Sequence, residues 1–332
     1  MRALDLFAGI GGFHLGMRAA GHHVVGAAEL DAHARAVYAR HFPGTPLWGD
    51  ATQVPAAEFP AHDILCGGFP CQPFSVAGRR AGIDDARGTL FYEIARVAEF
   101  HRPRWLLLEN VPGLLSIDDG HTYEALLRAL DAIGYDAGWQ VLRGEDWLPQ
   151  ARHRLWIVGT LRGGGGREIL PLAGTGAEDT GGGRPEARRI RSGRWGDRLD
   201  IVTGGEAKTL MAAGGSASER TGLYTVPFSG MHLNGHGQHL RDDGRSYTLS
   251  TWKEDACVAT GHPRGPDVGS VRAAIERGEM RVRRLTPLEC ERVQGFPDNW
   301  TAVKGVPEGA RYRLCGNAVM PPVVEFLGRM MS

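Results

Sequence analysis

Residues 3–29, ALDLFAGIGGFHLGMRAAGHHVVGAAE, decide the fold class of this chain. A short apolar run (3–7) leads into a glycine-rich turn, a helical pattern follows (12–20), and a second apolar run (23–28) ends at Glu29. This order is typical of a βαβ unit, in which a helix connects two parallel strands. The stretch therefore predicts an open sheet with a ligand-binding turn after its first strand.

The alternation of strand and helix patterns continues to about residue 160. Further strand patterns lie at 62–66, 104–110 and 155–160, and helical patterns lie at 32–41, 89–101 and 122–133. The sequence thus predicts an α/β fold with a doubly wound, mostly parallel sheet. From 163 to about 281 the chain is rich in glycine and its apolar runs are short, which predicts a smaller, irregular, β-rich second domain. Helical patterns return at 287–294 and 320–331.

Composition excludes several classes of protein. The chain has 332 residues, 38 basic and 38 acidic side chains and 42% hydrophobic residues, which is ordinary for a globular protein. No run approaches the ~20 apolar residues of a membrane span, and the first strand begins too early for a signal peptide. Five cysteines without a C-x-x-C pair indicate neither a disulfide framework nor a zinc site. These features predict a cytoplasmic, metal-free protein that has no contact with a membrane.

Nearly all of the basic residues are arginines, and six of them fall within residues 184–198. A solvated loop is one interpretation of this segment, and a strip that faces phosphates is the other.

The turn after the first strand has the features of a nucleotide site. Glycines such as Gly9 and Gly11 let a backbone approach a ligand, and Glu29, at the end of the second strand, is placed to bind a ribose diol. Together with Asp50 after the next strand, they predict a cofactor that contains adenosine. A dinucleotide is the alternative, but His14 occupies the sixth position of G-x-G-x-x-G and breaks that pattern.

Three other segments carry reactive side chains. Cys71 lies between two prolines in GGFPCQPFS, so it belongs to a loop at the carboxyl edge of the sheet. Glu109 follows three leucines and should be partly desolvated, which favours proton donation. Arg152 and Arg154 in QARHR precede a strand, and alternation would put both on one face, where an anionic group would fit between them. His232, His236 and His239 have the spacing of metal ligands, but the glycines between them disfavour the helix that would gather them.

The ordered motifs resemble those of one family. The segments are FAGIGGF, GGFPCQPFS, RGTLF (87–91), ENVPG, QARHR, RLTPLECERVQGFPD (284–298) and GNAVMPP (316–322). In order and spacing they are similar to the motifs of cytosine-5 DNA methyltransferases of the prokaryotic or phage type. The resemblance implies a Rossmann-like methyltransferase fold. It also implies a catalytic and cofactor domain at 1–165 plus 311–332, with a target-recognition domain at 166–310.

The resemblance implies a role for each catalytic residue. The Cys71 thiolate would add to C6 of cytosine, and Glu109 would hold the N3/N4 edge of the base. Arg152 would contact the base carbonyl, and Arg154 would support the site.

The implied cofactor is S-adenosylmethionine, with S-adenosylhomocysteine as product. Phe7 would pack on the adenine, Gly9 and Gly11 would approach the methionine end, Glu29 would bind the ribose and Asp50 the adenine amino group. Leu30 stands where relatives often have an aromatic against the adenine. The remaining positions that match cofactor contacts of the family are Pro70, Leu90 and Asn317.

The implied substrate is double-stranded DNA, from which the target base must flip out. Residues 76–88 would form a loop that closes over this base. The positions that would contact DNA are Ser75, Arg79, Arg80, Arg87, Gln150 and Thr248. We expect a monomer in the cytoplasm, associated with the nucleoid, that serves a restriction-modification system with a cognate restriction endonuclease or acts as an orphan methylase.

Three other functions are alternatives. One branch of the same family methylates cytosine in tRNA, although the Gly-Gly-Phe before Pro70 and the proline of ENVPG favour DNA. A catalytically silent binding module is disfavoured because Cys71 and Glu109 are present. A nicotinamide oxidoreductase would leave the Pro-Cys loop unexplained.

Overall fold

The structure is a computed structural model that describes residues 1–69, 90–148, 150–166, 169–170 and 285–331, together with five strands between 223 and 284. It divides into two compact units. The first consists of Met1–Leu142, His153–Ala207 and Pro321–Ser332, and the second of Arg143–Arg152 and Lys208–Met320. The division into a catalytic domain (1–165 plus 311–332) and a recognition domain (166–310) stays a prediction, because compactness does not assign a function.

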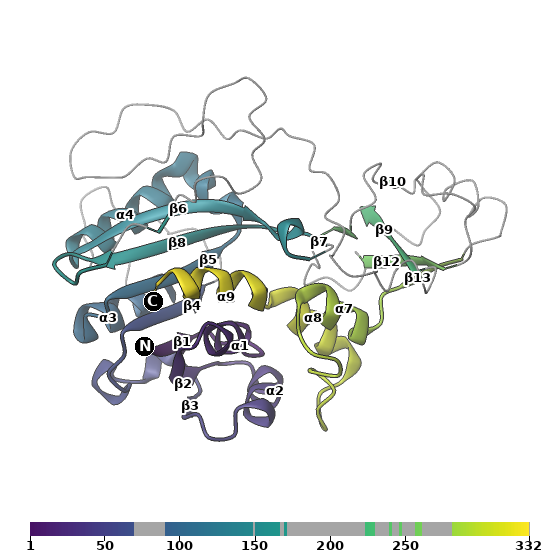
Figure 1. The fold of residues 1–332 in the computed structure, drawn as a ribbon, viewed down its shortest axis with the longest axis horizontal. Coiled ribbons are helices and arrows are strands. Elements are labelled where there is room, and N and C mark those ends of the chain that lie inside the picture. Colours follow the sequence, from purple (N-terminus) through teal and green to yellow (C-terminus); the bar gives the residue numbers. More distant parts are fainter. Residues whose placement is uncertain are drawn as a thin grey trace. The chain divides into compact units, whose positions relative to one another are not determined.

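The first unit is built on a seven-stranded sheet with the order β3-β2-β1-β4-β5-β8-β6 (Figure 1). The pairs β1–β2, β2–β3, β1–β4 and β4–β5 are parallel, and β8 is antiparallel to β5. The predicted doubly wound, mostly parallel sheet is therefore confirmed. Its strands are β1 (Arg2–Leu6), β2 (His23–Ala28), β3 (Leu47–Trp48), β4 (Ile64–Gly68), β5 (Trp105–Asn110), β6 (Tyr135–Arg143) and β8 (His153–Leu161).

Helices cover both faces of this sheet. On one face, Leu4, Leu6, Leu106 and Leu108 share a core with α3 and α4. Alternation sends the residues between them to the other face, where Phe13 of α1 meets Trp156 of β8 edge to face at 6.0 Å. The helices are α1 (Gly12–Ala19), α2 (Ala32–His41), α3 (Leu90–His101), α4 (His121–Ala132) and α9 (Pro321–Met330). Short 3-10 turns occupy Ala51–Gln53, Ala56–Glu58, Pro112–Leu115, Ile117–Gly120 and Gly144–Asp146.

The C-terminal helix α9 packs against α1. A Cβ atom on Gly16 would lie 2.5 Å from Val324 Cβ and 2.6 Å from the Pro321 carbonyl, so glycine is what allows the helices to approach. At the other end of the contact, His22 Nε2 is 2.9 Å from the Gly328 carbonyl. The last helix thereby ties the C-terminus to the helix that follows the glycine-rich turn.

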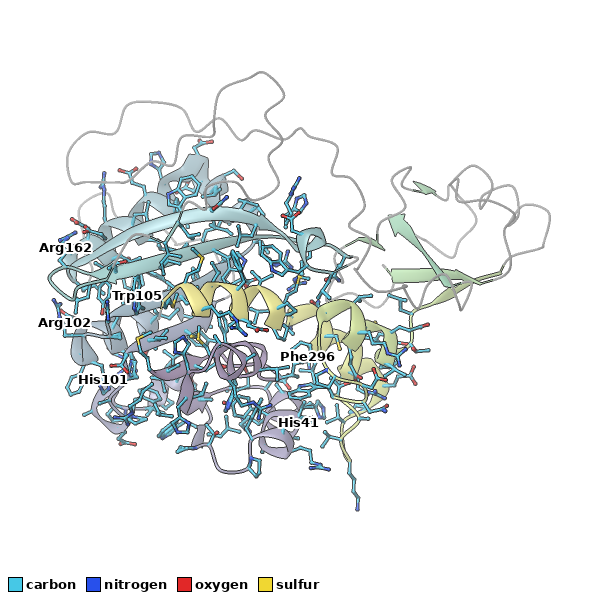
Figure 2. The ribbon with its side chains drawn as sticks, in the orientation of Figure 1. His41, His101, Arg102, Trp105, Arg162 and Phe296 are labelled. Carbon is cyan, nitrogen blue, oxygen red and sulfur yellow. The ribbon has the colours of Figure 1, made fainter. Side chains whose placement is uncertain are left out.

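β1 lies between β2 and β4, so chain connections leave it in opposite directions. In a doubly wound sheet such a switch point opens a crevice at the carboxyl ends of the strands, where ligands bind. The amino end of the same sheet is held by structural contacts. There Arg102, Trp105 and Arg162 lie near one another (Figure 2). Arg102 donates to the Ile133 carbonyl at 2.6 Å, and Arg162 pairs with Asp136 at 2.9 Å. Functional residues are therefore to be sought at the carboxyl end.

The second unit is smaller and β-rich, as expected. It contains an antiparallel sheet with the order β10-β9-β12-β13 and a parallel pair, β7 with β11. Its strands are β7 (Gln150–Ala151), β9 (Leu223–Ser229), β10 (His239–Leu240), β11 (Ser246–Tyr247), β12 (Ala256–Thr260) and β13 (Arg281–Arg284). Two helices follow, α7 (Pro287–Gln294) and α8 (Glu308–Asn317). Among the helices that the structure describes, none is long and apolar enough to cross a membrane.

Candidate functional site

The turn after β1 has an unusual backbone. Phe7, Gly9 and Gly11 all have positive φ angles of 59°, 55° and 89°, a conformation that is uncommon for a residue with a side chain, such as Phe7. A Cβ on Gly11 would lie 2.4 Å from Phe42 Cε2, so this glycine is needed for packing. Apart from its chain neighbours, none of the residues that the structure describes places an atom within 4 Å of a Cβ built on Gly9. Gly9 therefore faces open space that a ligand can enter.

Glu29 lies directly beside this turn, as the sequence analysis expected. Its Oε2 accepts a hydrogen bond from the Gly9 main-chain N–H at 2.7 Å, and its Oε1 accepts one from the Asp31 N–H at 2.7 Å. Each carboxylate oxygen keeps a lone pair for another donor, such as a ribose hydroxyl. Leu30, the next residue, is 69% exposed. The carboxylate is thus held in place by main chain from both sides.

Asp50 follows β3 at the same edge of the sheet, because β3 pairs in parallel with β2. Its Oδ1 accepts hydrogen bonds from the Thr52 main-chain N–H at 2.9 Å and the Thr52 hydroxyl at 2.7 Å. Arg96 of α3 holds the following turn by donating to the carbonyls of Ala51 and Val54. Leu90, another predicted cofactor contact, is the first residue of α3 and is half-buried.

Asp5 is a candidate that the sequence analysis did not single out. It lies in β1, two residues before Phe7, and is almost completely buried. Among the residues described, neither of its carboxylate oxygens has a hydrogen-bond partner. Burial, together with the charge of Glu29, raises the pKa of Asp5; the main-chain N–H of His14 works against this shift but falls short of hydrogen-bond geometry. A charged residue inside the apolar run ALDLF was the available signal.

The end of β5 carries the second group of candidates. Glu109 is buried and forms an ion pair with Arg154 of β8, with 2.9 Å between Arg154 Nε and Glu109 Oε1. The N–H is not directed at the oxygen, so the contact is an ion pair and not an aligned hydrogen bond. Burial lowers the pKa of Arg154, and the Glu109 carboxylate opposes that shift. The structure thus brings these two predicted residues together.

Asn110, which is not among the site residues predicted from the sequence, anchors the neighbouring chain. Its Nδ2 donates to the Phe69 carbonyl at 2.9 Å, and its Oδ1 accepts from the Val111 N–H at 2.8 Å. Phe69 is the last residue described before the segment that contains Cys71. The carboxyl end of β5 therefore holds both Glu109, the predicted catalytic carboxylate, and the residue that precedes the cysteine segment.

Arg152 and Arg154 do not share an environment. β8 begins at His153, so the strand alternation does not extend to Arg152, which belongs to the second unit. Arg152 is 2% exposed and donates to the carbonyls of Gly316 and Ala318. These carbonyls flank Asn317, which is exposed at the end of α8.

Gln150 is also in the second unit and is fully buried. Within the part of the chain that the structure describes, neither the oxygen nor the nitrogen of its side-chain amide has a hydrogen-bond partner.

The other predicted site residues lie outside the described residues: Pro70, Cys71, Ser75, Arg79, Arg80, Arg87 and Thr248. In the described ranges, no three His, Cys, Asp or Glu side chains gather in a way that could hold a metal ion.

Comparisons with known proteins agree with this arrangement. Residues 1–169 and 215–332 match the family described as C-5 cytosine-specific DNA methylase. The type II methyltransferase M.HaeII of Haemophilus aegyptius is 43% identical, over 99% of this chain and 92% of its own. M.HhaI of Haemophilus parahaemolyticus is 31% identical, over 98% and 93%. A solved structure of Spodoptera frugiperda DNMT2, 18% identical, has a similar fold with a TM-score of 0.63 over 99% of both chains. The resemblance noted in the sequence is confirmed: the chain belongs to the C-5 cytosine-specific DNA methylase family and is a DNA (cytosine-5-)-methyltransferase.

Proposed function

We propose that this enzyme transfers the methyl group of S-adenosylmethionine to C5 of one cytosine in a specific sequence of duplex DNA. The observation that carries the proposal is the pairing of Glu109 with Arg154 beside Asn110, which holds the chain two residues before Cys71. An acid, a cation and a nucleophile are what an attack on a cytosine ring requires.

The residues around the first turn fit the cofactor. Gly9 leaves open space at the end of β1, and the Glu29 carboxylate beside it is oriented by two main-chain donors. Leu30 offers an exposed apolar side chain next to them, suited to cover an adenine face. When bound, S-adenosylmethionine supplies an electrophilic methyl group on a sulfonium. Phe7, Gly9, Gly11, Glu29, Leu30 and Asp50 would hold it, together with Pro70, Leu90 and Asn317.

The chemistry that we propose begins with Cys71. Its thiolate forms a bond to C6 of the cytosine, and the electron pair of the C5–C6 double bond moves to C5 with delocalisation toward N3. Glu109 donates a hydrogen bond to N3 and stabilises the charge that develops there. Bound S-adenosylmethionine would supply the methyl group to C5, and its sulfonium carbon–sulfur bond would break to leave S-adenosylhomocysteine. Water removes the C5 proton, the C6–S bond breaks, and the thiolate is regenerated.

The roles of the arginines follow from their partners. Arg154 lies against Glu109, so we assign to it the orientation of that carboxyl and a contact to the flipped base. Arg152 was expected to contact the base carbonyl; in the structure both of its terminal nitrogens donate to main-chain carbonyls instead. A contact of Arg152 with the base stays a prediction. It would require Arg152 to give up one of its two hydrogen bonds to main-chain carbonyls and to donate to the base instead.

DNA recognition is assigned to residues 166–310. The target base must leave the duplex to reach Cys71, and residues 76–88 would close over it, with Arg79, Arg80 and Arg87 on phosphates. Ser75, Gln150 and Thr248 complete the proposed DNA contacts.

We further propose that the enzyme is a monomer that methylates nucleoid DNA in the cytoplasm. It would serve a restriction-modification system or act as an orphan methylase.

Trapping on a fluorinated duplex tests the proposal. 5-Fluorocytosine accepts the thiolate and the methyl group, but fluorine cannot leave as a proton does, so enzyme and DNA should remain covalently joined on a denaturing gel. We expect the adduct in the wild type and in Cys66→Ala, a core cysteine of β4, and no adduct in Cys71→Ser. Methyl transfer from radiolabelled cofactor to duplex DNA and not to tRNA would support the DNA assignment. The opposite preference would establish the tRNA alternative.

A further inference from the structure

Arg152 is a buried arginine whose guanidinium binds main chain. Its Nη1 donates to the Gly316 carbonyl at 3.1 Å and its Nη2 donates to the Ala318 carbonyl at 2.8 Å. The two acceptors are the residues immediately before and after Asn317. The side chain of Asn317 is exposed, whereas Gly316 and Ala318 are buried.

This contact acts as a cap on α8. The helix ends at Asn317 and the chain becomes extended at Ala318, so the last carbonyls have no partner within the helix. Gln294 of α7 donates to the Cys315 carbonyl at 2.8 Å. This carbonyl is close in the chain to the Gly316 and Ala318 carbonyls, which accept hydrogen bonds from Arg152. A cation at the carboxyl end of a helix also opposes the partial negative charge there. Two buried donors from other segments thus define the path of residues 315–318.

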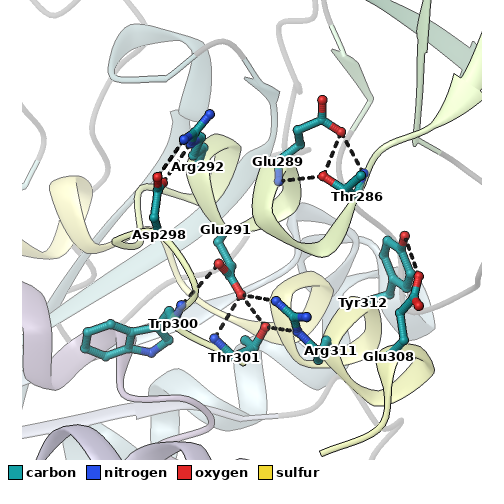
Figure 3. Close-up of polar contacts among 10 residues, drawn as sticks. All are labelled: Thr286, Glu289, Glu291, Arg292, Asp298, Trp300, Thr301, Glu308, Arg311 and Tyr312. Carbon is teal, nitrogen blue, oxygen red and sulfur yellow. Dashed lines mark hydrogen bonds and ion pairs between the residues drawn. The ribbon is translucent and has the colours of Figure 1, made fainter. Parts of the chain in front are cut away.

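The surroundings hold this cap in place. A Cβ on Gly144 would lie 2.8 Å from Met320 Sδ and 2.9 Å from the Arg152 carbonyl, so the segment before Arg152 packs closely on the segment after Asn317. The start of α8 is held as well. Glu291 of α7 is completely buried and accepts from Arg311 of α8 at 3.1 Å and from the Thr301 N–H at 2.9 Å (Figure 3).

We infer that Arg152 is a positioning residue, because it sets the backbone of 316–318 and so the direction of the Asn317 side chain. The inference rests on the proposed function, which gives Asn317 a cofactor contact. It separates the two arginines of QARHR: Arg154 serves the base through Glu109, and Arg152 serves the cofactor through Asn317.

The test compares Arg152→Met and Arg152→Lys with Arg154→Lys. We expect Arg152→Met to weaken cofactor binding, measured by calorimetry, by about 10-fold or more, since hydrogen bonds to charged groups are of that strength. Lysine at 152 should give a smaller loss, because one ammonium cannot bridge both carbonyls as a planar fork does. A loss of kcat at saturating cofactor that exceeds the loss of affinity would instead assign Arg152 to the base and would overturn the inference. Arg154→Lys should show the reverse pattern, with kcat reduced and cofactor affinity retained.

A double-mutant cycle with Asn317→Ala shows whether Arg152 acts through Asn317. In that case Arg152→Met should weaken cofactor binding little further once Asn317 is absent. The inference is overturned if folded Arg152→Met binds cofactor as the wild type does, or if the two losses are additive. If Arg152→Met does not fold, the cofactor affinities of Arg152→Lys and Gln294→Met, each with and without Asn317→Ala, provide the same test. A wild type that binds no S-adenosylmethionine would refute the proposed function itself, before any variant is measured.

Discussion

Arg154 reaches Glu109 across two antiparallel strands, with 2.9 Å between Arg154 Nε and Glu109 Oε1. In the strand register Glu109 lies opposite Trp156, so Arg154 is its diagonal neighbour on the same face. Because β8 is antiparallel to β5, the start of β8 meets the carboxyl end of β5. This reversal of one strand delivers an arginine to the edge where a parallel sheet gathers its functional groups.

We predict that Glu109→Gln and Arg154→Lys each lower kcat by about 100-fold or more, as expected for loss of a positioned acid or of the group that orients it. Cofactor affinity should change little, because neither residue lies at the Gly9 turn. Single-turnover methylation of duplex DNA measures the first effect and calorimetry the second. The matched control is Glu325→Gln, which breaks the exposed pair of Glu325 with Arg329 on α9 and should leave kcat unchanged. Glu109→Gln with half of the wild-type rate would contradict the assignment.

Asn110 should matter for catalysis although it does not touch the base. Asn110→Ala removes the donor to the buried Phe69 carbonyl, which we expect to lower the free energy of unfolding by about 1–3 kcal/mol. The kcat should fall more than this loss of stability explains, since the anchor for the cysteine segment is lost. Asn110→Asp removes the same donor while preserving shape and should behave like alanine. Urea unfolding and the rate of adduct formation on 5-fluorocytosine DNA separate the two effects. Full adduct formation in a destabilised Asn110→Ala would show that the anchor is not needed.

Much of the fold could be predicted because its signals are local. The runs 23–28, 32–41 and 287–294 match β2, α2 and α7 residue for residue. β6 was missed because most of its side chains are only half-buried, so no alternation marks it in the sequence. α8 was missed because its sequence, EGARYRLCGN, is polar and shows little helical periodicity.

The partners of site residues depend on tertiary structure and were harder to predict. Arg152 and Arg154 look equivalent in QARHR, but the strand begins between them and their guanidiniums meet different carbonyls and carboxylates. The neighbourhood of Gly9 and Glu29 could be predicted, since both follow adjacent parallel strands. The burial of Asp5 without a hydrogen-bond partner among the described residues could not, because it depends on tertiary contacts of β1, among them the nearby main chain of His14 in α1.

Gly9 and Gly11 should respond differently to alanine. Gly11→Ala combines a positive φ with a clash against Phe42, so it should lower the free energy of unfolding by about 2 kcal/mol or more. Gly9→Ala has the positive φ without the clash and should cost roughly 1 kcal/mol. Its methyl group projects into the space assigned to the cofactor, so its affinity for S-adenosylmethionine should fall by a larger factor than its stability suggests. Thermal unfolding and calorimetry on both variants test this. Equal losses of stability would argue against the packing role of Gly11.

The stability of the protein should depend on the protonation of His62. Burial lowers the pKa of His62 to about 4, and its Nδ1 donates to the Pro60 carbonyl at 2.8 Å, so the buried ring is neutral with its proton on Nδ1. An unfolded histidine has a pKa of about 6.5. As the pH falls from about 6.5 to 4, the unfolded state therefore binds a proton that the folded state does not, and stability decreases by up to ~3 kcal/mol from this residue. Above pH 6.5 the residue contributes no pH dependence.

His62→Asn tests this mechanism, because the asparagine amide can still donate to the Pro60 carbonyl but does not titrate. Urea unfolding between pH 4.5 and 7.5 should show a flatter decline in the variant, by about one proton at the acid end. His23→Asn, at an exposed position in β2, is the control and should follow the wild-type curve. Carboxylates also make the free energy of unfolding fall at acid pH, but they do so equally in all three proteins, so their contribution cancels in the comparison. If wild type and His62→Asn decline in parallel, the folded state must take up the proton as readily as the unfolded state, and His62 is not held neutral by burial.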